Sequence, residues 1–187
     1  MKIAITGHTG GIGKSFSELL TSRGHEIIGI SRSGGENIRR IEHTASIIES
    51  CDLFINNAQS MFAQTELLYE VWKRWQGQKK YIWNISTAMT QSPTNSAPDR
   101  QDDIAMSLYR IQKLSLEEAS KQLSHKNVWP AISIIRPGGV ATQKDWNNEN
   151  KHNVDDWTKS VIDIFTAHPN SHIPDISVTY RKTKLEL

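Results

Sequence analysis

Short apolar runs and amphipathic segments alternate along the chain. The first apolar run, Lys2–Ile5, leads through a glycine-rich turn into Gly13–Gly24, where apolar side chains recur at helical spacing. Glycine commonly ends helices, and a second apolar run, His25–Ile30, follows Gly24 directly. Strand, helix and strand in this order predict a βαβ unit, in which the two strands run parallel.

The same alternation continues toward the C-terminus. The further strands predicted by apolar runs are Asp52–Ala58, Tyr81–Thr87, Ala131–Ile135 and Ile173–Tyr180. The further helices are predicted over about Ala105–Leu123, with a stripe of Leu108, Ile111, Leu116, Ala119 and Leu123, and over Asp155–Ala167, with Trp157, Val161, Ile164 and Phe165 on one side. This pattern predicts an α/β fold: a single Rossmann-type domain over residues 1–187, with a doubly wound, mostly parallel sheet and helices on both faces.

Composition narrows the functional classes. Of the 187 residues, 37% are hydrophobic and 22% are charged, as is typical of one globular domain. The net charge of +2 without a basic run does not indicate nucleic acid, and no stretch approaches the roughly 20 apolar residues of a membrane span. Cys51, the only cysteine, is expected in the core, and a cytoplasmic location without a signal peptide is expected. The seven histidines lack metal-site spacing, so no metal is predicted.

The stretch TGHTGGIGKS, Thr6–Ser15, is similar to two kinds of phosphate-binding loop. A nucleoside-triphosphate P-loop would require glycine at position 8, where the chain has His8. In a dinucleotide-binding turn, glycines between a strand and a helix let the backbone approach a pyrophosphate at the helix N-terminus. The strand and helix predicted on either side favour the dinucleotide interpretation.

Five short motifs follow one another in an informative order. They are Thr6-Gly7-x-x-x-Gly11-Ile12-Gly13, Asn56-Asn57-Ala58, Asn84-Ile85-Ser86-Thr87, Tyr109-x-x-x-Lys113 and Pro137-Gly138-x-Val140-x-Thr142. Each is weak alone, but together they span residues 1 to about 142 and resemble the short-chain dehydrogenase/reductase family. The resemblance implies hydride transfer between a nicotinamide dinucleotide and a small-molecule carbonyl or alcohol substrate.

The resemblance also implies a catalytic set around Tyr109 and Lys113, which lie one helical turn apart. Tyr109 is expected to be the general acid in reduction and the base in oxidation. Lys113 is expected to lower the pKa of the Tyr109 phenol and to hold the nicotinamide ribose. Thr87 holds the place of the family's catalytic serine and would hydrogen-bond the substrate oxygen, with Ser86 as the alternative hydroxyl.

By the same resemblance, cofactor contacts lie at the ends of the predicted strands. The implied cofactor-binding residues are Gly7, Thr9, Gly11, Ile12, Gly13, Ser31, Arg32, Asn37, Ile38, Asn57, Ala58, Lys113, Pro137, Gly138, Val140 and Thr142. Asn56 and Asn57 are expected to brace the sheet beside the cofactor. Pro137 and Gly138 are expected to shape a turn that reaches the nicotinamide.

The end of the second predicted strand bears on the choice of dinucleotide. NAD-binding proteins usually carry an acidic residue there for the ribose hydroxyls, but this chain has Ser31-Arg32-Ser33. The guanidinium of Arg32 can form a planar, charge-assisted contact with a 2′-phosphate. The segment therefore favours NADP(H) as the cofactor.

The chain departs from the family pattern in several places. Residues 32–52 are few, so the third strand and its helix are expected to be small. No asparagine between Ala58 and Tyr81 completes the family's catalytic tetrad, and Asn57 and Gln59 are the two substitutes considered. The polar residues 88–100 are equally compatible with a lid and a surface insertion. The brief polar region after Thr142 predicts an open substrate site.

Two further expectations concern assembly and an alternative function. The family commonly pairs the helix that carries its tyrosine and lysine, so a homo-oligomer, first of all a dimer, is expected. Trp72 and Trp75 are candidates for that interface or for the core. The alternative to an enzyme is a non-catalytic dinucleotide-binding module, such as a redox sensor, because a fold does not establish a function. The pair of Tyr109 and Lys113 favours the enzyme.

Overall fold

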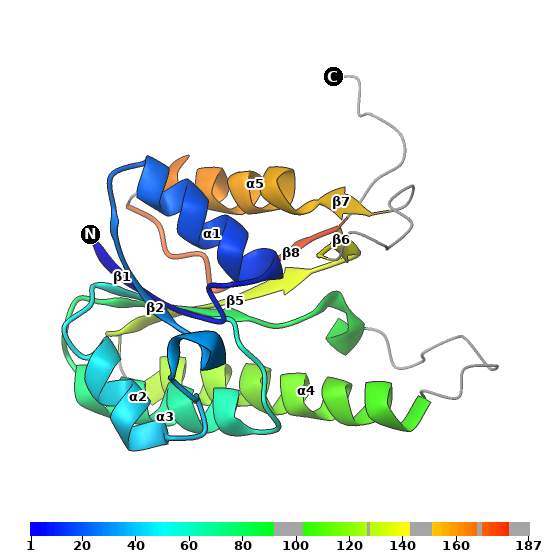
Figure 1. Ribbon diagram of the computed structural model, residues 1–187. Coiled ribbons are helices and arrows are strands. Elements are labelled where there is room, and N and C mark those ends of the chain that lie inside the picture. Colours follow the sequence, from blue (N-terminus) through cyan, green and yellow to red (C-terminus); the bar gives the residue numbers. More distant parts are fainter. Residues whose placement is uncertain (92–102, 127, 143–150, 168–169, 180–187) are drawn as a thin grey trace.

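The centre of the molecule is a six-stranded parallel sheet (Figure 1). The computed structural model describes residues 1–91, 103–126, 128–142, 151–167 and 170–179. The strands of the sheet are β1 (Lys2–Thr6), β2 (Glu26–Ile30), β3 (Leu53–Asn56), β4 (Tyr81–Ile85), β5 (Ala131–Pro137) and β8 (Asp175–Val178). Their order is β2-β1-β3-β4-β5-β8, and every neighbouring pair is parallel. The predicted doubly wound α/β fold is confirmed.

Helices cover both faces of the sheet (Figure 1). One face carries α1 (Gly11–Ser22) and α5 (Val154–Ala167), and the other carries α2 (Ile41–Ile48), α3 (Ala63–Trp75) and α4 (Asp103–Lys126). Each face has its own buried apolar cluster. Under α1 and α5, the rings of Phe16 and Trp157 meet edge to face with centroids 6.1 Å apart. The helices thereby bury the apolar side chains of both sheet faces, which is the main source of stability for such a fold.

The apolar cluster beneath α2, α3 and α4 involves Cys51, Trp72 and Trp75, which the sequence had marked as candidates for the core. Cys51 and Trp75 are fully buried in the cluster beneath α2, α3 and α4, as a small core thiol and a core indole. Trp72 is partly buried and packs against the same cluster. Both tryptophans therefore contribute to the packing of α3 within one chain.

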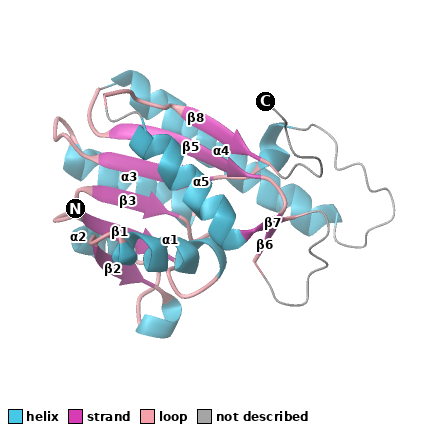
Figure 2. Cartoon of the chain, turned by 90° about the horizontal axis from the view of Figure 1, so that it is seen from above, coloured by secondary structure: helices cyan, strands magenta, loops and turns pink. Residues whose placement is uncertain are grey.

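The parallel strands bring their C-terminal ends to one edge of the sheet (Figure 2). From β1 the chain builds the sheet outward to β2, and it then returns to the other side of β1 with β3. In open α/β sheets, ligands usually bind at such a reversal, beyond the C-terminal ends of the strands, and we call this edge of the sheet the crevice. The predicted motifs at the ends of β1, β3, β4 and β5 all lie along this edge.

The small third strand predicted between Arg32 and Asp52 is wrong. After β2 the chain forms the short 3₁₀ helix η1 (Arg32–Gly34) and then α2, with no strand before β3. Because no strand pairs with its outer side in the described residues, β2 is an edge of the sheet. The segment is too short to hold both a crossover helix and another strand, so the helix that covers the core is retained.

Two predicted apolar stripes are only partly correct. In α4, Leu116, Ala119 and Leu123 are buried, but Leu108 and Ile111 are 46% and 51% exposed. The N-terminal half of α4 extends beyond the edge of the sheet, so nothing in the sheet covers it (Figure 1). In α5, Trp157 and Val161 are buried, whereas Ile164 is exposed because it faces away from α1 and the sheet.

The region after β5 is compact in the described residues. A two-residue parallel ladder joins β6 (Val140–Ala141) to β7 (His152–Asn153), directly before α5. Residues 92–102, most of the predicted lid or insertion, and residues 143–150 lie outside the described residues, as does Tyr180. In the described part of the chain, no helix is both long enough and apolar enough to cross a membrane.

Candidate active site

The glycine-rich loop folds tightly between β1 and α1. Gly7 has a φ of +72°, a backbone conformation that other residues rarely adopt. A Cβ atom on Gly13 would lie 2.3 Å from the Gly7 carbonyl oxygen and 2.6 Å from Asn57 Nδ2. The close approach requires glycine at position 13, in the first turn of α1. The first turn of a helix offers N–H groups without intrahelical partners, so this loop presents an anion-binding surface at the crevice.

Thr6 and Asn57 fasten the ends of β1 and β3 to each other. The Thr6 hydroxyl oxygen accepts hydrogen bonds from the backbone N–H groups of Asn57 and Ala58, at 2.9 and 3.0 Å. The Asn57 side chain donates to the Thr6 carbonyl oxygen at 3.0 Å. The bracing role predicted for Asn57 is confirmed, and it fixes the glycine loop at the crevice.

The turn after β2 lies against the glycine loop. Ser31 Oγ and Ser33 Oγ are 3.1 Å apart, and Ser33 donates to the Thr9 hydroxyl at 3.4 Å. Ser31 also accepts from the Gly34 backbone N–H and so caps η1. Arg32 is exposed on this turn. The structure thus brings together the predicted contacts Thr9, Ser31 and Arg32, all at the outer end of the crevice.

The residues predicted beside the adenine lie near the loop after β3. Asn37 Oδ1 accepts from the Arg39 backbone N–H at 3.0 Å, and Arg39 Nε donates to Ser60 Oγ at 2.9 Å. Ile38 is buried in the core cluster beneath α2. The Asn37–Arg39 segment therefore connects the region after β2 with the end of β3, even though the third strand is absent.

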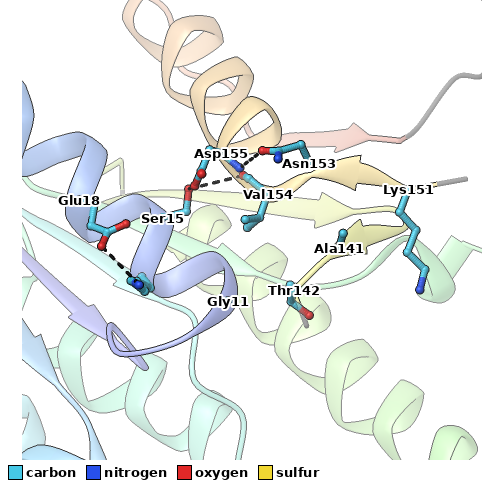
Figure 3. Close-up of a pocket in the computed structure, with 10 residues that line it drawn as sticks. Gly11, Ser15, Glu18, Ala141, Thr142, Lys151, Asn153, Val154 and Asp155 are labelled. Carbon is cyan, nitrogen blue, oxygen red and sulfur yellow. Dashed lines mark hydrogen bonds and ion pairs between the residues drawn. The ribbon is translucent and has the colours of Figure 1, made fainter. Parts of the chain in front are cut away.

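The Pro-Gly turn after β5 reaches the start of α1. A Cβ atom on Gly11 would lie 3.2 Å from Thr142 Cβ, so these two predicted cofactor residues are in contact across the crevice. Beside them is an open pocket of about 530 Å³ between α1, the β6–β7 ladder and the start of α5 (Figure 3). Ser15 closes one side of the pocket by donating to Asp155 Oδ1 at 2.6 Å.

Three of the predicted catalytic residues lie together where β4 and α4 meet. Thr87, directly after β4, lies beside Tyr109 on α4, close enough for its hydroxyl to favour the ionised form of the phenol. Lys113 Nζ lies 5.6 Å from the centroid of the Tyr109 ring. Thr87 is buried and Tyr109 is half-buried, so a small molecule in the crevice can reach the phenol.

Lys113 is held by two oxygen acceptors that belong to other elements. Its Nζ donates to Gln64 Oε1 on α3 at 2.8 Å and to the Ile85 carbonyl oxygen on β4 at 2.7 Å. Only 3% of Lys113 is exposed, so these contacts replace water around the amine. Asn57 and Gln59, the two tetrad substitutes considered from the sequence, do not supply these contacts.

Ser86 belongs to a different, fully buried network. Its hydroxyl donates to Glu117 Oε1 at 2.5 Å, and Thr90 donates to the same oxygen at 2.7 Å. Arg136 on β5 binds both carboxylate oxygens of Glu117, at 3.0 and 2.9 Å. Ser86 therefore helps to solvate a buried ion pair, and Thr87 is the hydroxyl that faces Tyr109.

The same network fixes the segment that follows Thr87. In the 3₁₀ helix η2 (Ala88–Gln91), the Thr90 hydroxyl lies within hydrogen-bond distance of both the Thr87 carbonyl oxygen and Glu117 Oε1. Arg110, the neighbour of Tyr109, donates to the Met89 and Thr90 carbonyl oxygens at 3.0 and 3.3 Å. Two residues of α4 thus hold the chain on which Thr87 lies, and they fix its hydroxyl opposite Tyr109.

Burial dominates the electrostatics of this site. Desolvation lowers the pKa of Lys113 to about 7, although the nearby Glu117 carboxylate acts in the opposite direction. Burial also raises the pKa of Tyr109, and the Thr87 hydroxyl only partly offsets this effect. The predicted lowering of the Tyr109 pKa by Lys113 is therefore wrong for this structure. The reason is that burial of the phenol itself disfavours the charged phenolate.

Three important residues were missed from the sequence: Gln64, Glu117 and Arg136. Gln64 gave no signal, because a glutamine near a helix start is usually a solvated residue. The ion pair did leave a trace, since Glu117 is one turn after Lys113 and Arg136 ends an otherwise apolar strand. Among the described residues, no group of histidine, cysteine, aspartate and glutamate side chains is arranged to hold a metal ion.

Comparisons with known proteins agree with this geometry. A family model described as the NAD dependent epimerase/dehydratase family matches residues 3–69, which include the glycine loop and β3. A search of curated proteins finds no match. The match agrees with the Rossmann-type α/β fold and with the position of the glycine loop between β1 and α1.

Solved structures with a similar fold cover nearly the whole chain. A short-chain dehydrogenase/reductase from Vibrio parahaemolyticus is 15% identical, with 99% of each chain covered and a TM-score of 0.75. A short-chain dehydrogenase from Sphingobium yanoikuyae in complex with NADPH is 16% identical over 94% of this chain and 87% of its own, with a TM-score of 0.69. An alcohol dehydrogenase from Thermococcus sibiricus complexed with 5-hydroxy-NADP is 13% identical over 100% and 99%, with a TM-score of 0.70. At these identities the similarities show that the chain shares its fold with these three proteins.

Proposed function

We propose that this protein is an NADP(H)-dependent oxidoreductase that acts on a small carbonyl or alcohol substrate. The observation that carries the proposal is the contact of Thr87 with Tyr109, one helical turn from Lys113, on the same edge of the sheet as the glycine loop. Acid/base group, cation and phosphate-binding loop are thus arranged along one crevice. Structural neighbours solved in complex with NADPH or NADP support the choice of cofactor.

The residues present fit a bound dinucleotide. The loop carries no side chain at Gly7, Gly11 or Gly13, so a pyrophosphate can approach the N–H groups of α1. Thr142 lies against Gly11 and would contact the cofactor from the opposite side. Arg32, with Ser31 and Ser33 beside it, would bind the 2′-phosphate. When bound, the nicotinamide supplies or accepts the hydride.

Thr87, Tyr109 and Lys113 form the inner end of the crevice, and they would supply the proton in a reduction. A substrate oxygen between Thr87 and Tyr109 would accept hydrogen bonds from both hydroxyl groups. Because the raised pKa keeps Tyr109 protonated at neutral pH, its phenol is ready to give its proton to the oxygen of a carbonyl that is being reduced. Lys113, when protonated, would stabilise the phenolate that remains and would donate to the nicotinamide ribose.

The test is a turnover assay of the purified chain with NADPH and a panel of aldehydes and ketones, in which the loss of NADPH absorbance is followed. Tyr109→Phe removes only the hydroxyl, so turnover should fall by about 10²–10⁴-fold while the affinity for NADPH is retained. Equal turnover in the parent and in Tyr109→Phe would remove Tyr109 from the mechanism. Binding of NADPH without turnover on any substrate would instead favour the non-catalytic binding module.

We also propose that the chain forms a homo-oligomer through α4. Ile104, Leu108 and Ile111 lie on one face of this helix and are 86%, 46% and 51% exposed. Exposed apolar stripes of this kind are typical of protein interfaces. Light scattering at micromolar concentration should give at least a dimeric mass for the parent and a smaller mass for Leu108→Glu. A monomeric parent would contradict the proposal.

A further inference from the structure

Gln64 lies in the first turn of α3 and is 2% exposed. Its amide makes three hydrogen bonds within the protein. The nitrogen donates to the carbonyl oxygens of Asn56, at 2.6 Å, and of Ile85, at 3.1 Å. The oxygen accepts from Lys113 Nζ at 2.8 Å. A buried glutamine with both of its polar atoms engaged is held in one orientation, because a flipped amide would face an ammonium with its own nitrogen.

Lys113, Gln64 and Ile85 together form a closed triangle of hydrogen bonds. The Ile85 carbonyl oxygen accepts from both Lys113 Nζ and Gln64 Nε2, while Gln64 Oε1 accepts from the same Nζ. An ammonium group has three N–H donors, and the triangle uses two of them. One donor therefore remains for a ribose hydroxyl in the crevice.

We propose that Gln64 is the positioning residue for Lys113 in this protein, and that its side-chain amide fixes the ammonium directly. This inference rests on the proposed function. It also assigns the place left open by the missing tetrad asparagine to a residue at the start of α3. Because Gln64 is buried and its polar atoms bond within the protein, it would act through Lys113 and not by contact with a ligand.

The other candidates for this role are occupied elsewhere. Asn57 donates its side-chain amide to the Thr6 carbonyl oxygen, on the glycine-loop side of β3. Gln59 is exposed and donates to Gln112 Oε1 on α4, next to Lys113 in sequence but not to Lys113 itself. Gln59 therefore offers a matched control: it is also a glutamine that connects the region before α3 to α4, but it leaves the ammonium untouched.

Gln64 is anchored in a buried polar chain that runs beneath α4. Asn56 donates to the Gln64 carbonyl oxygen and to Asn84 Oδ1, both at 2.9 Å, and Asn84 donates to Ser120 Oγ at 2.9 Å. Asn56 Oδ1 finds no partner among the described residues. The chain ties α3, β3, β4 and α4 together, so the position of the Gln64 amide is set by four elements at once.

Several charged and polar groups face Lys113 and can change its pKa. On its own helix, Glu117 is one turn away and Tyr109 one turn in the other direction. From β5, Arg136 neutralises Glu117 by binding both of its carboxylate oxygens. From α3 and β4, the facing groups are the neutral oxygens of Gln64 and Ile85. Gln64 is thus the neutral contact whose replacement should change the protonation of Lys113 most directly.

The experiment is an NMR titration of the Lys113 side-chain nitrogen in the full chain without cofactor, with Lys113→Met used to assign its signal. In Gln64→Met the ammonium loses an acceptor, so the pKa of Lys113 should fall by about one unit from the parent value of about 7. In Gln64→Glu a carboxylate faces the amine, so the pKa should rise by about one unit or more. Gln59→Met should leave the titration unchanged.

Opposite shifts in the two Gln64 variants are expected only if this side chain controls the ammonium. An unchanged Lys113 titration in Gln64→Met would overturn the proposal, as would equal shifts in Gln59→Met. If Gln64→Glu fails to fold, Gln64→Asn keeps the amide but shortens its reach, and it should lower the Lys113 pKa as Gln64→Met does. A Lys113 shift in a protein that turns over no substrate would retain the role of Gln64 and would reject the proposed function alone.

Discussion

The two ends of the crevice are built on opposite physical principles. At the inner end, Lys113 and Glu117 are almost fully buried and are held by partners from α3, β4 and β5. At the outer end, Arg32 lies exposed on a 3₁₀ turn that is shaped by the small hydroxyl groups of Ser31 and Ser33. The inner end is organised before any ligand arrives, whereas the outer end offers a solvated charge whose contribution depends on what binds.

This difference sets the expected cost of a substitution. Removing a group from the inner end leaves a buried polar partner without its contact, and the whole fold is destabilised. Removing a group from the outer end exposes nothing new, so stability is retained and only ligand binding changes. The following predictions test this contrast, from the largest expected effect to the smallest.

Glu117→Leu should give the largest effect, on folding itself. The substitution leaves the Arg136 guanidinium buried without its bidentate partner, and breaking such a pair typically costs about 3–5 kcal/mol. Denaturant unfolding of the parent and the variant measures this difference. Glu118→Leu is the matched control, because Glu118 is exposed on the next position of α4 and should change the free energy of unfolding little. Equal costs in the two variants would show that the inner network is not what stabilises this region.

Arg32→Ala should act on cofactor binding and not on stability. Loss of a hydrogen bond to a charged group costs about 1.5–3 kcal/mol, so the affinity for NADPH should fall by about 10- to 100-fold. The affinity for NADH, which lacks the 2′-phosphate, should change much less. Titration of both cofactors measures the two effects. Arg40→Ala, which removes the same charge from another exposed position, serves as the control, and a similar loss there would show a general charge effect.

Gly29→Ala tests the one tightly packed place near the outer end. A Cβ atom on Gly29 of β2 would lie 2.4–2.5 Å from ring atoms of His8, whose Nδ1 has no partner among the described residues. Overpacking of this kind costs about 1–3 kcal/mol. The cost should largely disappear in the His8→Ala background, which thermal or denaturant unfolding of the double mutant measures. A cost that persists without His8 would place the strain in the β2 backbone.

The pH dependence of stability gives the smallest effect per step, about 1 kcal/mol for each pH unit, and it tests the buried amine. Lys113 titrates near pH 7 when folded and near 10.5 when exposed, so between these values the unfolded chain binds more protons. The stability of the parent relative to Lys113→Met should therefore rise with pH by about 1 kcal/mol per unit between pH 7 and pH 10. Below pH 7 this difference should be constant. A flat difference across the alkaline range would show that Lys113 keeps an ordinary pKa in the fold.

The fold class and the order of most elements, apart from the strand predicted between β2 and β3, were determined by the sequence alone. Apolar runs with intervening amphipathic segments specify strands and helices through local periodicity, and parallel pairing follows from their alternation. Glycine at position 24 ends α1 as predicted, with a φ of +82°. The contact between Thr87 and Tyr109 was also foreseeable, because a hydroxyl at the end of β4 and a tyrosine on the following helix match a known order of motifs.

Only the tertiary structure determined burial, side-chain contacts between distant residues, and the direction of the Tyr109 pKa. Leu108 is exposed because α4 extends beyond the end of the sheet. The apolar periodicity of α4 cannot predict where the sheet ends. Gln64 reaches Lys113 across 49 positions, and Arg136 reaches Glu117 across 19, so neither contact has a local signature. The direction of the Tyr109 pKa was mispredicted for the same reason: charge favours the phenolate, but burial opposes it, and burial exists only once α4 has packed onto the sheet.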